Sequence, residues 1–214
     1  MKKEKVSEAV IRRLPKYYRY LKDLERMGVE RISSQELSKK MGIKATQIRQ
    51  DLNCFGGFGQ QGYGYHVKML KKELKNIIGI NREYKVILIG AGHIGQALAN
   101  YHGFENEGFN IVGIFDNNPE LTGKTIRNIT IMHIETLHDF VKENQVDLCI
   151  IATPKENAQE TADKVIGVGI RSIWNFAPVD VDARMGVCVE NVHLNDSLYT
   201  LIYRMNDSGP KSFV

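Results

Sequence analysis

The stretch KVILIGAGHIG, residues 85–95, decides the fold of the longer part of this chain. Residues 85–89 form a short apolar run of strand-forming residues, and residues 96–102 have the spacing of a helix. Between them, Gly90, Gly92 and Gly95 have the GxGxxG spacing of a dinucleotide-binding turn. A strand, this turn and a helix in this order predict a site in which a pyrophosphate lies against the helix N-terminus.

A carboxylate follows at the distance that such a site requires. The strand expected at residues 110–115 ends in Asp116, which is 21 residues beyond Gly95. The acid that bonds the ribose hydroxyls usually stands about 20 residues on. No arginine comes directly after Asp116 to pair with a 2′-phosphate, so we expect NAD and NADH as cofactors. The alternative is an ordinary carboxylate in the turn after a strand.

Strands and helices continue to alternate after Asp116. Strands are expected near residues 126–131, 147–152, 171–174 and 187–190, with helices over 135–144 and 156–167. This alternation predicts an α/β fold, a doubly wound parallel sheet that binds its ligand at the carboxyl ends of the strands. The residues expected to bind the cofactor there are Gly90, Ala91, Gly92, His93, Ile94, Gly95, Gln96, Asp116, Asn117, Thr153, Pro154, Asn175 and Phe176. A last helix, expected from about Asp196, has an apolar stripe that either packs on its own domain or pairs with another subunit.

Residues 1–80 predict a separate domain. Ser33 and Glu36 have the spacing of a capping box at the start of a short helix. After a turn at Gly42, a second helix is expected over residues 44–55. Two short helices around a glycine turn are typical of a helix-turn-helix, although generic helical hairpins have similar spacing. Near Pro15, the first helix of the domain should break or restart.

The second of these helices has a polar face suited to DNA. Thr46, Gln50 and Asn53 lie opposite its apolar residues, and amide side chains can bond adenine. The glycine-rich and aromatic residues 56–65, GGFGQQGYGY, then predict a β-hairpin wing beside it, with a flexible linker as the alternative. The expected DNA contacts are Arg12, Arg13, Ser33, Ser34, Lys44, Ala45, Thr46, Gln47, Arg49, Gln50, Asn53, Phe58, Gln60, Gln61 and Tyr63.

The charge of the chain is divided unequally. Residues 1–80 hold 18 Lys or Arg against 8 Asp or Glu, whereas residues 81–214 hold 11 against 17. The formal net charge of +4 is therefore the sum of a basic first part and an acidic second part. Only the basic part is expected to bind a polyanion. The alternative to DNA binding is that these lysine-rich helices are simply exposed to solvent.

The three cysteines are odd in number and widely spaced, which argues against disulfides and a zinc site. No signal peptide or apolar run long enough to cross a bilayer is seen, so we expect a cytoplasmic protein without membrane or metal partners.

Taken together, these motifs make the chain similar to the Rex family of bacterial redox-sensing repressors over essentially its whole length. The matching residues are Arg13-Leu14-Pro15, Ile32-Ser33-Ser34, Arg49 with Asp51-Leu52, Gly62-Tyr63-Gly64-Tyr65, Gly90–Gly95 and Asn175-Phe176-Ala177-Pro178. The resemblance implies a winged helix-turn-helix domain at residues 1–80, a Rossmann domain at 81–192, and a dimerisation helix and tail at 193–214 that swaps between the subunits of a homodimer. It also implies binding of double-stranded operator DNA when NAD⁺ prevails and release when NADH binds.

Four positions depart from the family pattern. Gln50 and Gln61 stand where the family usually has basic residues, and Lys44 stands where it has Thr or Ser, which leaves the operator sequence open. In the family, an acid near the last helix approaches an Arg and a Tyr, and this relay corresponds here to Arg19 and Tyr101, with His193 in place of the acid. Tyr101 is also expected to contact the cofactor. An imidazole in this relay would make it sensitive to pH.

Two other functions compete with the repressor. An NAD-dependent oxidoreductase would need a substrate domain and a placed acid or base, and only a short tail follows the Rossmann segments. We therefore expect no enzymatic activity. A DNA-binding protein that uses the Rossmann fold only for dimerisation, or that senses another nucleotide such as coenzyme A, is disfavoured by the glycine loop with Asp116.

Overall fold

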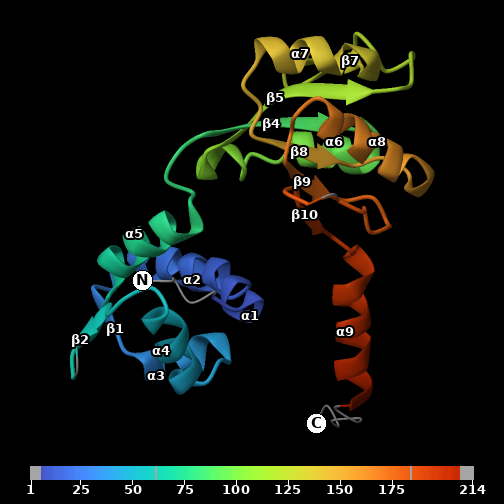
Figure 1. Cartoon of the computed structure of the whole chain (residues 1–214). Coiled ribbons are helices and arrows are strands. Elements are labelled where there is room, and N and C mark those ends of the chain that lie inside the picture. The colour runs from blue at the N-terminus through green and yellow to red at the C-terminus, as the bar shows by residue number, and fades with distance from the viewer. Residues whose placement is uncertain (1–5, 61, 184, 208–214) are drawn as a thin grey trace. The chain divides into compact units, whose positions relative to one another are not determined.

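The structure is a computed structural model, which describes residues 6–60, 62–183 and 185–207. The chain divides into two compact units, Met1–Arg82 and Glu83–Val214, and each is described by itself (Figure 1).

The first unit combines helices with a small antiparallel sheet. Its helices are α1 (Glu8–Ile11), α2 (Leu14–Arg26), α3 (Ser34–Met41), α4 (Ala45–Asn53) and α5 (Val67–Ile78). Its strands are β1 (Arg31–Ile32), β2 (Gly59–Gln60) and β3 (Gly64–His66), in the order β1-β3-β2. The hairpin β2–β3 follows α4 directly, so the unit is a helix-turn-helix with a wing.

Local bonds explain where these helices begin and end. Ser33 and Glu36 form the predicted capping box, in which the Glu36 N–H donates to Ser33 Oγ at 3.1 Å and the Ser33 N–H to Glu36 Oε2 at 2.8 Å. Gly42 ends α3 with a left-handed φ of 67°, which glycine adopts without strain. As predicted, the chain restarts at Pro15, which stands in the first turn of α2, where its missing N–H costs no bond.

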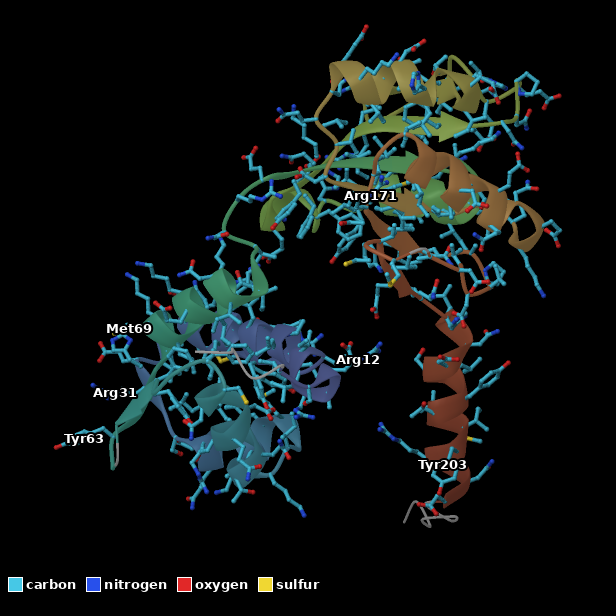
Figure 2. The ribbon with its side chains drawn as sticks, in the orientation of Figure 1. Arg12, Arg31, Tyr63, Met69, Arg171 and Tyr203 are labelled. Atoms are coloured by element: carbon cyan, nitrogen blue, oxygen red, sulfur yellow. The ribbon has the colours of Figure 1, made fainter. Side chains whose placement is uncertain are left out.

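The strands β2 and β3 pair as an antiparallel hairpin, which is the predicted wing and not a linker. Gly64 has a φ of +70°, and a Cβ there would come within 2.5 Å of the Ile32 carbonyl oxygen. Any other residue would therefore push β3 away from β1. Arg31 of β1 and Tyr63 of the wing are both exposed (Figure 2).

The second unit contains a seven-stranded sheet. Its strands are β4 (Tyr84–Ile89), β5 (Phe109–Asp116), β6 (Thr125–Ile126), β7 (Ile129–His133), β8 (Leu148–Ile151), β9 (Ser172–Asn175) and β10 (Cys188–Asn191). They lie in the order β10-β9-β8-β4-β5-β7-β6, and every pairing except the antiparallel β6–β7 is parallel. The six parallel strands have the 3-2-1-4-5-6 order of a dinucleotide-binding fold.

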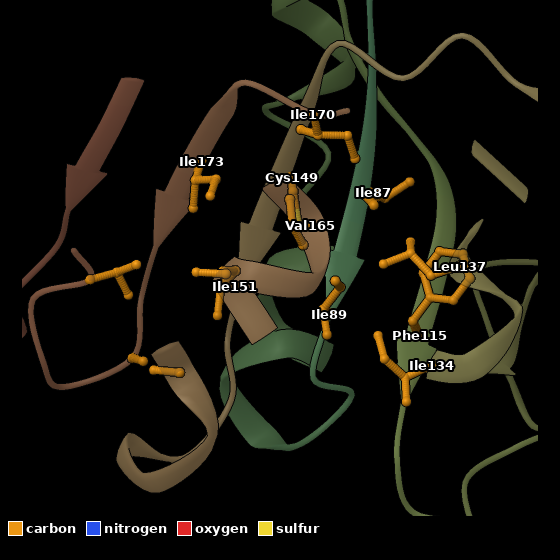
Figure 3. Packing of buried hydrophobic residues seen from close by; sticks show 14 residues of the cluster. Ile87, Ile89, Phe115, Ile134, Leu137, Cys149, Ile151, Val165, Ile170 and Ile173 are labelled. Atoms are coloured by element: carbon orange, nitrogen blue, oxygen red, sulfur yellow. The ribbon is translucent and has the colours of Figure 1, made fainter. Parts of the chain in front are cut away.

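Helices cover both faces of this sheet. They are α6 (His93–Ala99), α7 (Leu137–Glu143) and α8 (Lys155–Gly167), with 3₁₀ turns η1 (Glu105–Glu107) and η2 (Ile134–Thr136). Ile87 and Ile89 of β4 pack with residues of α7 and α8 (Figure 3), whereas Val86 and Leu88 pack on the other face with Ala99 of α6. Alternate residues of one strand thus serve two cores, which explains the continuous apolar run.

Three segments differ from the sequence prediction. The helix expected over residues 96–102 is α6, which begins three residues earlier, at His93, and ends at Ala99. The single strand expected at residues 126–131 is a hairpin, because Arg127 and Asn128 have positive φ values of 48° and 67° and form the turn between β6 and β7. The terminal helix α9 (Leu194–Asp207) begins two residues before Asp196. None of the described residues of α9 is buried.

No helix among the described residues is long and apolar enough to span a membrane. Within the same described ranges, no group of three or more His, Cys, Asp or Glu side chains is gathered as metal ligands would be. Cys54, Cys149 and Cys188 are free thiols.

Candidate nucleotide pocket and DNA-reading surface

The second unit has a cavity of about 570 Å³ where the central strands end. The glycine turn after β4, the residues after β5 and β8, and α8 all contribute to it. Of the residues predicted to bind the cofactor, those that line the cavity are Gly90, Gly92, His93, Ile94, Asp116, Asn117, Thr153, Pro154 and Phe176.

The three glycines of the turn have different roles. A Cβ on Gly90 would lie 2.5 Å from the Ala152 carbonyl oxygen, and one on Gly95 would lie 1.8 Å from the Gly90 carbonyl oxygen. Both positions therefore need glycine for the fold itself. A Cβ on Gly92 would meet nothing within 4 Å, and its φ of −70° is ordinary. Gly92 thus leaves open space at the cavity wall, as the close approach of a pyrophosphate requires.

Asp116 braces the glycine turn from the end of β5. It is 9% exposed, its Oδ2 accepts the Ala91 N–H at 2.6 Å, and its Oδ1 accepts the Asn118 N–H at 2.8 Å. Each carboxylate oxygen has a second lone pair, so a ribose hydroxyl could still donate to it. Asp116 is thus a turn carboxylate that also lines the cavity, and its bond to a ribose stays a prediction.

Some predicted cofactor residues lie outside the cavity lining. Ala91 and Gly95 are buried, and Gln96 Nε2 donates to the Ala91 carbonyl at 2.8 Å, so these residues shape the turn from behind. Asn175 is fully buried, and Tyr101 is 58% exposed and packs edge-on against Phe104. Asn175 and Tyr101 do not line this cavity, and their contact with the cofactor stays a prediction.

Helix α8 contributes a wall that the sequence analysis did not include. Asn157, Glu160, Thr161 and Lys164 line the cavity, and their spacing of three and four residues places them on one helix face. That spacing of polar residues after Thr153-Pro154 was the available signal. Lys164 Nζ forms an ion pair with Glu160 Oε1 at 3.2 Å, and this bond raises the pKa of Lys164.

One polar atom in the pocket has no protein partner. Thr153 Oγ1 is buried and makes no hydrogen bond within the described residues. A buried hydroxyl without a partner is costly, and a ligand with hydrogen-bonding groups would satisfy it. Together with the open space at Gly92, this hydroxyl fits a dinucleotide in the cavity.

In the first unit, α4 presents an exposed polar face. Thr46, Arg49, Gln50 and Asn53 are exposed, as predicted, and Lys44 precedes the helix as its exposed N-cap residue. Ile48 and Leu52 are buried on the opposite side, in the core of the unit. The helix is therefore anchored by one face and free to meet a ligand with the other.

A buried carboxylate fixes this helix to α2. Asp51 is fully buried and accepts bonds from Arg13 at 2.5 and 2.8 Å, from the Tyr17 hydroxyl at 2.6 Å and from Gln47 at 2.7 Å. Burial alone would raise the pKa of Asp51, but these bonds outweigh it and hold that pKa below its usual value. Arg13 and Gln47, predicted as DNA contacts, are thus engaged in positioning α4.

The remaining predicted DNA contacts differ in their surroundings. Ser33 is occupied by its capping box, and Arg49 Nη1 donates to Ser34 Oγ at 2.8 Å, which joins α4 to the start of α3. Phe58 is partly buried against the core, and Ala45 is half-buried, so both support the surface more than they form it. Arg12 is exposed and pairs with Glu8 at 3.2 Å. Gln61 and the side chain of Gln60 lie outside the described residues.

The start of α9 is connected to the loop beside the cavity. The Val192 N–H donates to the Asn175 carbonyl at 2.8 Å, and Asn175 Nδ2 donates to Asn191 Oδ1 at 2.8 Å. His193 Nε2 lies 2.8 Å from Asp180 Oδ1, and that contact raises the pKa of His193. Asn175 and His193 therefore tie the strand that leads into α9 to the segment after Phe176. Arg19 is exposed on α2.

Comparison with known proteins gives matches to both units. A family model described as "Putative DNA-binding protein N-terminus" matches residues 5–53, and one described as "CoA binding domain" matches residues 81–179. The "Redox-sensing transcriptional repressor Rex" of Thermoanaerobacter pseudethanolicus is 57% identical over 206 residues, which cover 96% of this chain and 92% of that protein.

Two solved structures resemble the whole chain. The crystal structure of RSP in complex with beta-NAD⁺ and operator DNA has a TM-score of 0.90 and 55% identity, and it covers 96% of this chain and 94% of that chain. The crystal structure of RSP in complex with beta-NADH has a TM-score of 0.89 and 52% identity, with 96% of each chain covered.

Proposed function

Because the chain belongs to the Rex family of redox-sensing transcriptional repressors, we propose that it binds operator DNA when NAD⁺ prevails and leaves the operator when NADH binds. The observation that carries this proposal is the presence of two unlike surfaces on one chain. One is the exposed polar face of α4 in the basic unit, and the other is the cavity beside Gly92 and Thr153. RSP is similar over almost the whole chain, and its two complexes hold NAD⁺ with operator DNA, and NADH.

The protein acts by binding and not by turnover. The nicotinamide of a bound NAD(H) would supply redox chemistry, but the acidic and lysine side chains of the cavity are already engaged, and His93 on its wall makes no hydrogen bond to another side chain of the described residues that would orient it as a base. Asp116 accepts two backbone N–H groups, and Lys164 is paired with Glu160. Catalysis would need a placed acid or base that is free to exchange a proton with a substrate.

The terminal helix supports an assembly of two copies of the chain. Leu198, Leu201 and Ile202 of α9 are exposed to between 42 and 60%. Such an apolar stripe is buried only when another surface covers it. A second copy of the chain, with the terminal helices swapped between the two subunits, supplies that surface. We therefore propose a homodimer that binds DNA, and we propose the cytoplasm as its location.

The test of this function is a thermodynamic linkage. A ligand shifts an equilibrium only by its differential affinity for the two states, so operator DNA should weaken NADH binding by the same factor by which NADH weakens DNA binding. We expect a factor of about five or more in each direction, and little coupling or the opposite sign for NAD⁺. Titration with and without the operator duplex of the RSP complex measures both. Equal NADH affinity in the presence and absence of bound operator would contradict the proposal.

The relay to the DNA-binding unit is proposed to involve Tyr101, Arg19 and His193. Within this relay, pH is expected to act on the start of α9. His193 faces Asp180 and Asp196, and the bond to Asp180 is the main cause of its raised pKa. The folded state therefore favours the protonated ring. The ion pair between His193 and Asp180 stabilises the folded state fully below the unfolded pKa of histidine, which is about 6.5. This stabilisation is lost as pH rises through the raised folded pKa.

Titration of the His193 ring by nuclear magnetic resonance should consequently give a pKa above about 6.5, which Asp180→Asn lowers. The coupling between NADH and operator should change with pH across the same range in the native protein and not in His193→Gln. His102→Gln, at an exposed histidine bonded to the Asn100 carbonyl, is the matched control and should keep the pH dependence. A pH-independent native coupling would show that the ion pair plays no part in the relay.

A further inference from the structure

The wing lacks a charge of its own. Residues 56–65 contain neither Lys, Arg, Asp nor Glu, although a wing beside a recognition helix lies against a polyanion. A cation from another strand stands next to it. Arg31 of β1 donates from Nη1 to the Tyr63 carbonyl at 3.5 Å, and its guanidinium carbon lies 5.9 Å from the centre of the Tyr63 ring.

The sheet fixes this pair in place. Residues alternate in direction along β1, so Ile32 is buried while Arg31 is exposed. Arg31 pairs in register with His66, and Gly64 brings β3 into close backbone contact with Ile32. Tyr63, the residue before Gly64, is 71% exposed. Both side chains therefore reach solvent at one edge of the domain (Figure 2).

Their chemistry matches duplex DNA. An arginine on an aromatic face keeps its N–H donors in a flat array, and this geometry suits both phosphate oxygens and a narrow minor groove. Arg49, the nearest cation on α4 in sequence to the wing, is bonded to Ser34 at the start of α3. We propose that Arg31, held against Tyr63, supplies the cationic DNA contact of the wing.

This inference rests on the proposed function, and the experiment distinguishes a failure of the inference from a failure of that function. The probe is the operator duplex of the RSP complex, with affinity measured by fluorescence anisotropy over a series of salt concentrations in the presence of NAD⁺. Arg31→Ala should weaken binding on the order of tenfold and lower the salt slope by about one for each bound subunit. Tyr63→Ala should show a smaller loss in the same direction, because it removes the ring but not the charge.

The matched control is Lys75→Ala, which removes one exposed positive charge from the last turn of α5. Lys75 is about 12 Å along that helix from the end of β3. It should bind operator as the native chain does. Unaltered melting temperatures of all three variants would show that the losses concern the contact and not folding.

A second arm distinguishes the two DNA elements that an arginine could meet. Changing A·T pairs beneath the wing to G·C places a guanine amino group in the minor groove. If Arg31 enters that groove, the change weakens the native protein and not Arg31→Ala, whereas a phosphate contact leaves both proteins unaffected. Equal binding by Arg31→Ala and the native protein, or an equal loss in Lys75→Ala, would overturn the inference. Failure of the native chain to bind operator would overturn the proposed function itself.

Discussion

Gly92→Val is expected to abolish NADH binding, with a loss of affinity of at least about a hundredfold, and to leave operator binding intact. The reason is the contrast among the three glycines of the turn. Side chains at Gly90 or Gly95 would collide with the protein, whereas a Cβ at Gly92 meets nothing within 4 Å. Valine at this position therefore fits the free protein and fills the space that the pyrophosphate needs.

Isothermal titration with NADH and a binding assay with operator DNA measure the two halves of this expectation. The variant should repress regardless of NADH. Gly167→Val is the matched control, since Gly167 also has free space around its Cα but lies at the end of α8 and does not line the cavity. If Gly92→Val binds NADH as tightly as the native protein, the dinucleotide does not occupy this pocket.

Asp51→Ala is expected to have the largest effect on stability. It leaves Arg13 without the carboxylate that it bonds twice and leaves the buried Tyr17 hydroxyl without its acceptor. Breaking a buried ion pair by removing one partner costs about 3–5 kcal/mol. The helical circular dichroism transition of the first unit should shift to lower temperature. Trp174 is the sole tryptophan and lies in the second unit, so the transition followed by its fluorescence should stay unchanged.

The control is Asp23→Ala, because Asp23 is an exposed acid whose ion pair with Arg26 spans 3.9 Å and contributes at most about 0.5 kcal/mol. Asp51→Asn should lie between the two, since an amide keeps some of the bonds. The lowered pKa of Asp51 adds a pH dependence. Its stabilisation is present above the unfolded pKa of about 3.9 and is lost as pH falls through the folded value, so native and Asp51→Ala stabilities should converge in acid. A constant difference down to pH 2 would contradict this assignment.

Several features were predictable because their causes lie within a few residues. The capping box at Ser33, the turn at Gly42 and the restart of α2 at Pro15 all depend on bonds or dihedral angles of neighbouring residues. The glycine spacing of residues 90–95 similarly determines a turn between a strand and a helix. Single-residue chemistry and short-range periodicity sufficed for these elements and for the fold class.

The hairpin at Arg127–Asn128 was missed although it is local. These residues carry no glycine signal, and their left-handed conformation is one that such residues seldom adopt. Asn128 alone offered a weak indication, since asparagine tolerates this region better than most residues.

Tertiary structure alone decided which polar side chains are free. By sequence pattern, Arg13 and Gln47 suit DNA binding as well as Arg49 does. In the structure both bond the buried Asp51, which is 38 residues from Arg13. Folding likewise places the polar residues of α8 on the cavity wall, and it places Arg31 beside Tyr63, which is 32 residues away in the chain. A sequence pattern determines which residues share a face or a strand. Whether a polar group on that face is free for a ligand depends on partners that only folding brings within bonding distance, because a buried polar group is stable only when it is bonded.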